Sequence, residues 1–268
     1  MRFLSLAALA LLAAVPASAQ LAAPNAAGVT YGHVHLSVAD AAVHTALWQE
    51  HFGAQIVTKG PLTVAKIPGT LIAFQGRAPT GGSGGSAMDH MGLKVRSIRA
   101  VADKWRAAGL EVEREFTGAE GVPNAYLIAP DGVRIELQED PALPVPVAGY
   151  HVHWFSDINT DVMNFYARHF GATIRPRGTL QTTADVPGMN LTFAGCPDGN
   201  ECTPTRGRAI DHIGFEIDNL REFVARMQAA GVEFEAEPRF IESIGLTIAY
   251  FTDPAGVRVE LTEGYDEY

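Results

Sequence analysis

Six residues, three in each half of the chain, have side chains of the types that bind divalent metal ions. His33, His90 and Glu136 form the first set, and His151, His212 and Glu260 form the second. Two neutral imidazoles and one carboxylate hold Fe(II) and related ions while leaving coordination positions open. A buried carboxylate is costly to keep ionised without a cation. The residue types therefore predict one divalent metal ion per occupied half, drawn from Fe, Mn, Ni and Zn.

Both sets belong to sequence blocks that occur twice. The segment GHVHLSVAD, which begins at Gly32, recurs as YHVHWFSDI, and DHMGLKV recurs as DHIGFEI. PDGVRIEL recurs as PAGVRVEL, in the same order and at nearly the same spacing. This self-similarity indicates duplication of a whole domain rather than a short solenoid repeat. We expect a first domain at 28–140, a second at 149–265, and a linker at 141–148, where prolines disfavour helix and central strand.

The histidines and glutamates lie in segments with the alternation of half-buried strands. Val34, Leu36 and Val38 alternate with polar residues, so His33 and His35 must face the other way. The blocks around His90 and Glu136, and their copies in the second half, have the same parity. Three strands of each half are thus expected to bring the three ligands of that half to one face.

Helical segments follow the first strand of each unit. Residues 41–52 read as a helix ended by Gly53, and residues 99–108 as a second helix ended by Gly109. Short strand-like runs follow each helix, which gives two βαβββ modules per half. Because strands with one apolar face need helices to cover it, the sequence predicts an α+β fold. In this prediction each half is a curved mixed sheet that encloses a cavity, with its helices outside.

Four further residues are candidates for moving protons. His35 and His153 lie two residues beyond the first histidine of each set, on the same strand and face. Each could be a substitute metal ligand, a support for a ligand or a general base, and a packing role fits its position equally well. Tyr126 and Tyr250 lie just before the strands that carry the glutamates. A phenol there could donate a proton or pack in the core.

The N-terminal residues predict export. Arg2 precedes an apolar run from Phe3 to Val15, and small residues follow it, which is typical of a signal peptide at 1–19 cleaved after Ala19. No later stretch is long and apolar enough to span a bilayer. We therefore expect a periplasmic or secreted protein with no membrane contact after cleavage. Cys196 and Cys202 are then expected to form a disulfide in an oxidising compartment, with a metal or redox role as the alternative.

The net charge of the chain indicates which classes of partner it can bind. The sequence has 30 acidic and 20 basic residues, a formal charge of −10, and no basic patch. A phosphate backbone would be repelled, so we expect a small-molecule substrate and no nucleic acid. The sequence leaves a homodimer open.

The repeated blocks resemble the vicinal oxygen chelate superfamily, which includes glyoxalase I, bleomycin-resistance proteins, fosfomycin-resistance enzymes and extradiol dioxygenases. The resemblance covers residues 30–264 and rests on the order HVHLSVAD, HFGA, DHMGLKV and PDGVRIEL, found twice. It implies that the family's metal ligands correspond to the six residues named above. It also implies an enzyme that binds two neighbouring oxygens of a small substrate on the metal, as a lyase or isomerase.

Two departures from known members bear on the reaction. Glyoxalase I has a fourth ligand, a glutamate on the strand before the interunit linker, whereas TLIAFQG and NLTFAG have no carboxylate there. Extradiol dioxygenases share the order Tyr, Pro-x-Gly, Glu, but their histidine just before that tyrosine has no counterpart at 117–123 or 242–246. The alternatives are a ring-cleaving dioxygenase and a non-catalytic small-molecule-binding protein of the bleomycin-resistance type.

Overall fold

Four βαβββ modules follow one another along the chain in a computed structural model that describes residues 21–197, 202–265 and 268. Module 1 consists of β1 (Val29–Val38), α1 (Ala41–Phe52), β2 (Gln55–Lys59), β3 (Leu62–Ile67) and β4 (Thr70–Gly76). Module 2 consists of β5 (Met88–Val95), α2 (Ile98–Ala107), β6 (Glu111–Thr117), β7 (Pro123–Ala129), the short 3-10 helix η1 (Pro130–Gly132) and β8 (Val133–Glu139).

The second half repeats this order of elements. Module 3 consists of β9 (Val147–Phe155), α3 (Asn159–Phe170), β10 (Thr173–Ile174), β11 (Thr183–Val186) and β12 (Met189–Ala194). Module 4 consists of β13 (Ile210–Ile217), α4 (Leu220–Ala229), β14 (Arg239–Ile241), β15 (Leu246–Thr252) and β16 (Arg258–Glu263). The predicted signal peptide at 1–19 lies outside the described residues.

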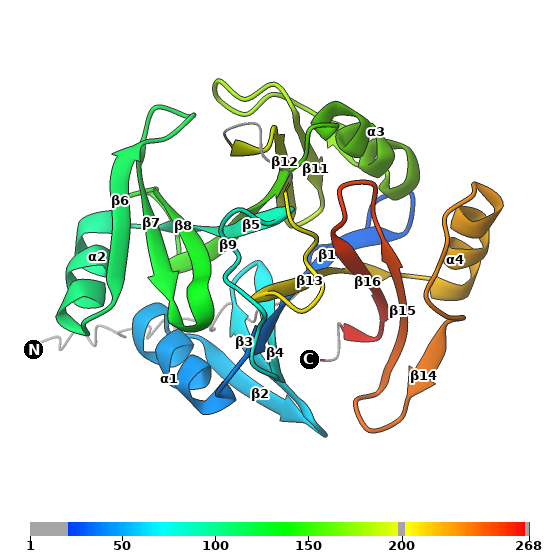
Figure 1. The fold of residues 1–268 in the computed structure, drawn as a ribbon, viewed down its shortest axis with the longest axis horizontal. Coiled ribbons are helices and arrows are strands. Elements are labelled where there is room, and N and C mark those ends of the chain that lie inside the picture. The colour runs from blue at the N-terminus through cyan, green and yellow to red at the C-terminus, as the bar shows by residue number, and fades with distance from the viewer. Residues whose placement is uncertain (1–20, 198–201, 266–267) are drawn as a thin grey trace, which may run out of the picture.

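The strands form two eight-stranded mixed sheets, and each sheet takes one module from each half. Sheet I has the order β14-β15-β16-β13-β1-β4-β3-β2 and joins modules 1 and 4, and sheet II has the order β10-β11-β12-β9-β5-β8-β7-β6 and joins modules 2 and 3. In Figure 1 the blue strand β1 accordingly lies beside the yellow strand β13. The predicted α+β fold with four βαβββ modules is confirmed. The prediction that each half forms its own sheet is wrong.

The first strands of the modules join the two halves. β1 pairs antiparallel with β13, with His35 opposite His212, and β5 pairs antiparallel with β9, with His90 opposite His153. The alternation of side chains fixes which face each residue takes, but backbone hydrogen bonds do not depend on which module supplies the neighbouring strand. The first strands of all four modules have the same alternation of apolar and polar residues. The sequence pattern is therefore compatible with pairing inside one half or between the two halves.

The helices cover one face of each sheet and bury the apolar half of the alternation. Val34 of β1 packs in the same core as Trp48 of α1, and both are fully buried. Helix α1 begins after Asp40, whose side chain accepts a hydrogen bond from the backbone N–H of Ala42. It ends at Gly53, which has a φ of 65° as the predicted left-handed cap. The polar half of the alternation is left for the opposite face, which we call the inner face.

Two further sequence predictions concern the chain as a whole. Cys196 and Cys202 form the predicted disulfide. Among the described residues no helix is both long and apolar enough to cross a membrane.

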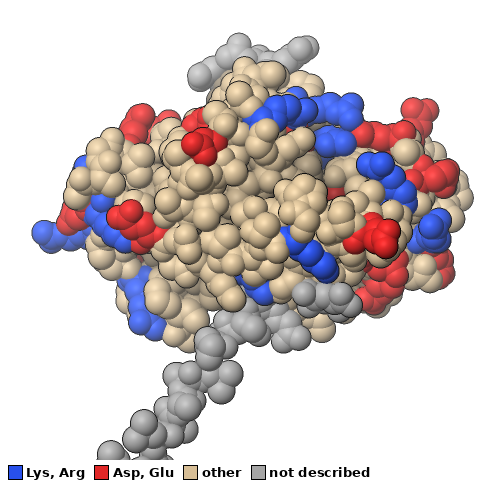
Figure 2. All heavy atoms as spheres, turned by 90° about the horizontal axis from the view of Figure 1, so that it is seen from below, with Lys and Arg blue, Asp and Glu red and all other residues tan. Residues whose placement is uncertain are grey.

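Figure 2 shows one side of the molecule, on which residues of both charges lie mainly toward the margin and uncharged residues occupy most of the centre.

Candidate metal centre

Cluster I lies at the centre of sheet I on its inner face. His33 and His35 come from β1, His212 comes from β13, and Glu260 comes from β16. Each offers one ligand atom, and these atoms all lie within 4.8 Å of one another. Glu260 Oε2 is 2.9 Å from Nε2 of His33 and 3.1 Å from Nε2 of His212. A single carboxylate oxygen thus faces two imidazole nitrogens.

Cluster II has the same design in sheet II. His90 comes from β5, Glu136 from β8, and His151 and His153 from β9. Glu136 Oε2 is 2.8 Å from His90 Nε2 and 3.3 Å from His151 Nε2. His90 and His151 have no exposed surface, and Glu136 has 6%. The ligand atoms are therefore held inside the protein, where imidazole and carboxylate groups are costly to leave unpaired.

The structure corrects the grouping of the six predicted ligands. His33 lies with His212 and Glu260, and His151 lies with His90 and Glu136, so each cluster uses residues of both halves. The expected grouping of the ligands by halves is wrong, because β1 pairs with β13 rather than with β5. The parity argument still holds within each strand: every predicted ligand does point to the inner face.

A glycine in each repeated block makes room for the histidine of the other half. A Cβ placed on Gly92 would lie 2.1 Å from Cε1 of His151, and one on Gly214 would lie 2.0 Å from Cε1 of His33. No side chain fits at such distances, so each imidazole lies directly against the glycine backbone. The sequence pattern did not predict that these glycines contact a histidine, although a glycine follows both DHM and DHI in the repeated block.

An aspartate beside one histidine of each cluster was also missed. Asp89 Oδ1 is 2.6 Å from His90 Nδ1, and Asp211 Oδ1 is 2.7 Å from His212 Nδ1. Neighbours along a regular strand point to opposite faces, but the pairing of β5 with β9 shifts register at Asp89, and a similar shift occurs in β13. A carboxylate on Nδ1 fixes the tautomer that leaves Nε2 free to bind a metal ion.

The electrostatics of both clusters favour a positive charge between histidine and glutamate. Burial by itself lowers the pKa of His90, but hydrogen bonds with Asp89 and Glu136 outweigh it and raise the pKa above its ordinary value. Burial by itself raises the pKa of Glu136, but His151 and His90 hold that pKa well below its ordinary value. In cluster II burial lowers the pKa of His151 to about 4. The carboxylates of Asp89 and Glu136 on either side of His90 therefore favour a positive charge at this ring.

His35 and His153, the two histidines of undecided role, lie inside the clusters. Burial lowers the pKa of both well below the ordinary value, so both rings are neutral. Among the described residues neither nitrogen of His35 has a hydrogen-bond partner, and the Nε2 of His153 has none. His153 Nδ1 lies 3.1 Å from His90 Nε2. A neutral imidazole keeps one lone pair, which a further metal ligand or a proton acceptor needs.

Tyr250 and Tyr126, the two candidate proton donors, make different contacts in their clusters. Tyr250 donates a hydrogen bond to Glu260 Oε1 at 2.5 Å, and burial followed by the charge of Glu260 raises its pKa far above the ordinary value. This phenol holds the carboxylate and keeps its proton. In cluster II the same carboxylate oxygen, Oε1 of Glu136, accepts from Asn124 instead. The centroid of the Tyr126 ring lies 5.1 Å from that of the His90 ring and 3.8 Å from Cζ of Arg134.

Both clusters fit a divalent metal ion by their donor chemistry. Each offers a carboxylate oxygen and neutral or proton-sharing imidazoles, the set that binds Fe, Mn, Ni and Zn. Among the described residues neither ring nitrogen of His35 has a partner, and a metal ion at cluster I would give one of them a partner. No cysteine takes part, because the two cysteines of the chain form the disulfide.

Replacing Asp89 by asparagine is expected to weaken metal binding at cluster II by about 10–100-fold, the usual effect of removing the group that orients a histidine ligand. The neutral amide no longer fixes the tautomer of His90. Asp211→Asn is the matched control, because it should weaken only the ion at cluster I. Titration with a competing chelator measures both. Equal weakening of the two ions by Asp89→Asn would contradict this assignment.

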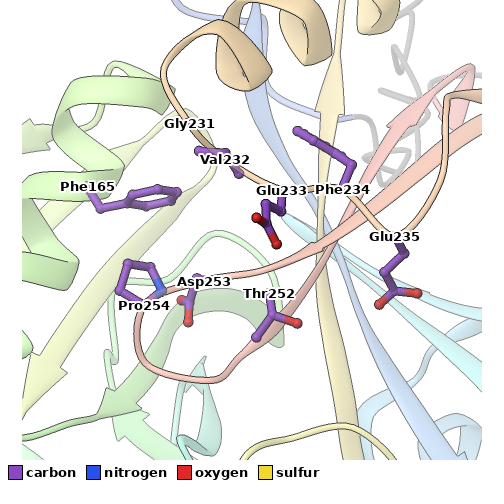
Figure 3. A pocket seen from close by; sticks show the side chains of 9 residues that line it. All are labelled: Phe165, Gly231, Val232, Glu233, Phe234, Glu235, Thr252, Asp253 and Pro254. Atoms are coloured by element: carbon purple, nitrogen blue, oxygen red, sulfur yellow. The ribbon is translucent and has the colours of Figure 1, made fainter.

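A separate hollow of about 490 Å³ lies away from both clusters. It is bounded by Phe165 of α3, the segment after α4 that starts at Gly231, and the turn between β15 and β16 that contains Asp253 (Figure 3). Asp253 accepts hydrogen bonds from Trp154 Nε1 and Tyr166 Oη, so its carboxyl joins this turn to β9 and α3. None of the cluster residues lines this hollow.

Comparison with known proteins identifies a family and a fold. The model of the family described as Glyoxalase/Bleomycin resistance protein/Dioxygenase superfamily matches residues 30–137 and 159–261. No curated protein matches the chain by sequence. Among solved structures, glyoxalase I from Zea mays has a TM-score of 0.65 at 17% identity, over 88% of this chain and 92% of that chain. A putative dioxygenase from Bacillus subtilis has a TM-score of 0.62 at 13% identity, over 87% and 84%.

Proposed function

Because this chain belongs to the glyoxalase, bleomycin resistance protein and dioxygenase superfamily, we propose that it is a divalent-metal enzyme of the lyase or isomerase type. Its substrate is a small molecule that binds the metal through two neighbouring oxygens. The observation that carries the proposal is the convergence of Glu136 Oε2 with the Nε2 atoms of His90 and His151. Such a set holds an ion and leaves positions open for substrate.

Cluster II is the proposed site of turnover, because the inner faces of the two sheets differ in polarity. Across from His151 and His153, β12 presents Asn190 and Thr192. Across from the matching histidines of cluster I, His33 and His35, β4 presents Leu71 and Ala73. A polar face suits an oxygenated substrate, whereas an apolar one leaves its hydroxyl or carbonyl groups unpaired.

Tyr265, which follows β16, packs against one histidine of cluster I. The Tyr265 ring packs on His33 with 4.8 Å between ring centroids, and Tyr265 has only 2% of its surface exposed. The backbone N–H groups of Gly264 and Tyr265 donate to Glu216 Oε1, at 2.6 and 3.0 Å. Tyr265 belongs to an apolar cluster with Leu71 on the same inner face. We assign cluster I a bound ion without turnover.

The residues of cluster II have separate tasks in the proposed reaction. When bound, the ion would polarise the two substrate oxygens and stabilise the negative charge that develops on them. His90, His151 and Glu136 hold it, and Asp89 orients His90. His153 is neutral, so one of its two ring nitrogens keeps a lone pair that can accept a proton from the substrate. Burial raises the pKa of Tyr126 above its ordinary value, so this phenol stays protonated.

Elemental analysis of the purified protein tests the proposal. We expect two ions per chain, from Mn, Fe, Ni or Zn, and loss of turnover when a chelator removes them. A protein that binds none of these metals in stoichiometric amount would rule the proposal out. Oxygen uptake by the Fe(II)-loaded protein with catechols would instead assign the chain to the ring-cleaving alternative.

We also propose that the protein acts outside the cytoplasm. The disulfide between Cys196 and Cys202 supports export, since such bonds persist in oxidising compartments. The predicted cleavage after Ala19 is the second support. N-terminal sequencing of the protein recovered from the periplasm or the medium tests it, with Gln20 as the expected first residue.

A further inference from the structure

Three donors on the inner face of sheet II converge on one carboxylate oxygen. Oε2 of Glu120 accepts a hydrogen bond from Tyr150 Oη at 2.7 Å and a second from Gln138 Nε2. Nη1 of Arg177 lies 3.6 Å from the same oxygen. A phenol, an amide and a guanidinium around one oxygen make a binding place for a carboxylate.

Arg177 is an unusual residue to find here, because its side chain is only 5% exposed. Nη2 donates to Thr192 Oγ1 at 3.0 Å, and within the described chain Nε has no hydrogen-bond partner. Its ion pair with Glu120 is long. A buried guanidinium with an unused donor is costly unless an anion completes its contacts. The arginine is therefore under-satisfied by the protein's own groups.

Glu120 reaches this place from a surface loop rather than from the sheet. It lies between β6 and β7, and its side chain is 28% exposed. The neighbouring Ala119 accepts a backbone hydrogen bond from Thr179, in the loop after β10. Burial by itself raises the pKa of Glu120, but Tyr150, Gln138 and Arg177 lower it below the ordinary value, so the three donors favour a negative charge.

The donors border the metal-binding residues. Gln138 lies two residues beyond Glu136 on β8, and Tyr150 directly precedes His151, with 5.5 Å between the two rings. Thr192, which holds Arg177, pairs across from His153. A small molecule that chelates an ion at cluster II can therefore present a second group to these donors.

Sheet I lacks the same arrangement. In the repeated blocks Gly32 stands where Tyr150 stands, so the phenol has no counterpart. Ala73 pairs across from His35 where Thr192 pairs across from His153, so the hydroxyl that holds the arginine is absent as well. The donor group is thus specific to cluster II and is not a requirement of the fold.

We propose that Tyr150, Gln138 and Arg177 form a carboxylate-binding subsite, and that Glu120 fills it until a substrate carboxylate displaces it. The substrate class that follows is a small molecule with two chelating oxygens and, a short distance away, a carboxylate. This inference rests on the proposed metal function of cluster II. When the substrate binds, the loop that carries Glu120 moves away from the inner face.

Calorimetric titration of the full mature protein, loaded with Zn(II), tests the subsite. The probes are catechol, 3,4-dihydroxybenzoate and 3,4-dihydroxybenzamide, since Zn(II) does not oxidise them. We expect the carboxylate to bind at least about tenfold more tightly than the amide, with one site per chain. Arg177→Met should abolish this preference. Arg175→Met is the matched control: its side chain is 60% exposed and pairs with Asp185, so the preference should remain.

Glu120→Gln provides an independent readout, because it changes an exposed loop and tests the subsite even if Arg177→Met does not fold. Removing the competing carboxylate should strengthen binding of 3,4-dihydroxybenzoate several-fold and leave catechol unchanged. Equal affinity for the acid and the amide in the unaltered protein would overturn the subsite while chelation stands. If none of the three probes binds the Zn(II)-loaded protein, the proposed function itself fails.

Discussion

Glu136→Ala is expected to release one of two metal ions and to reduce turnover by more than about 100-fold. Glu136 Oε2 faces both His90 and His151, and among the described residues Glu136 is the only carboxylate of cluster II, so its substitution removes the negative ligand. Substitution of groups that merely support a ligand already costs about 10–100-fold. Metal content and the rate of the reaction measure the effect.

Glu260→Ala is the matched control for this experiment. It should also release one ion, that of cluster I, but turnover should change little because cluster II is the proposed site of turnover. Double variants then test which residues share an ion. Glu136→Ala with His151→Ala should lose no more metal than Glu136→Ala, whereas Glu136→Ala with His33→Ala should lose both ions. The opposite pattern would restore the grouping by halves.

Gly92→Ala is expected to displace a histidine that lies in the other half of the sequence. The added methyl group would lie 2.1 Å from His151 Cε1, so the ring or the strand must move. Overpacking of this kind destabilises a protein by about 1–3 kcal/mol. We expect a lower melting temperature and loss of the ion at cluster II, measured by thermal unfolding and elemental analysis.

Two glycines supply controls for this substitution. Gly214→Ala places its methyl group 2.0 Å from His33 Cε1 and should release only the ion of cluster I. Gly76→Ala meets no atom within 4 Å and should leave both ions and the stability close to those of the unaltered protein. If Gly92→Ala released the ion at cluster I instead, the assignment of His151 to cluster II would be wrong.

The candidate site could be predicted in part because its residues obey strand parity. His33, His90 and Glu136 lie on alternating segments, and their side chains do point to the inner face. The role of Asp89 could not be predicted, because the alternation of residue types does not reveal the register shift that turns its side chain toward His90. The place of Arg177 could not be predicted, because this residue lies outside the repeated blocks. Only the folded chain brings it beside Tyr150.

The sequence by itself predicted the four βαβββ modules, the family resemblance and six candidate ligands, and it favoured a disulfide over a metal or redox role for the two cysteines. These follow from periodicity, repetition and residue type, which are local properties of the chain. Only the tertiary structure decided which modules share a sheet, and therefore that His33 lies with Glu260 rather than with Glu136. The reason is physical: a strand edge offers the same backbone hydrogen bonds to any partner. It also decided that Tyr265 packs against His33 of cluster I, a contact made between residues far apart in the chain.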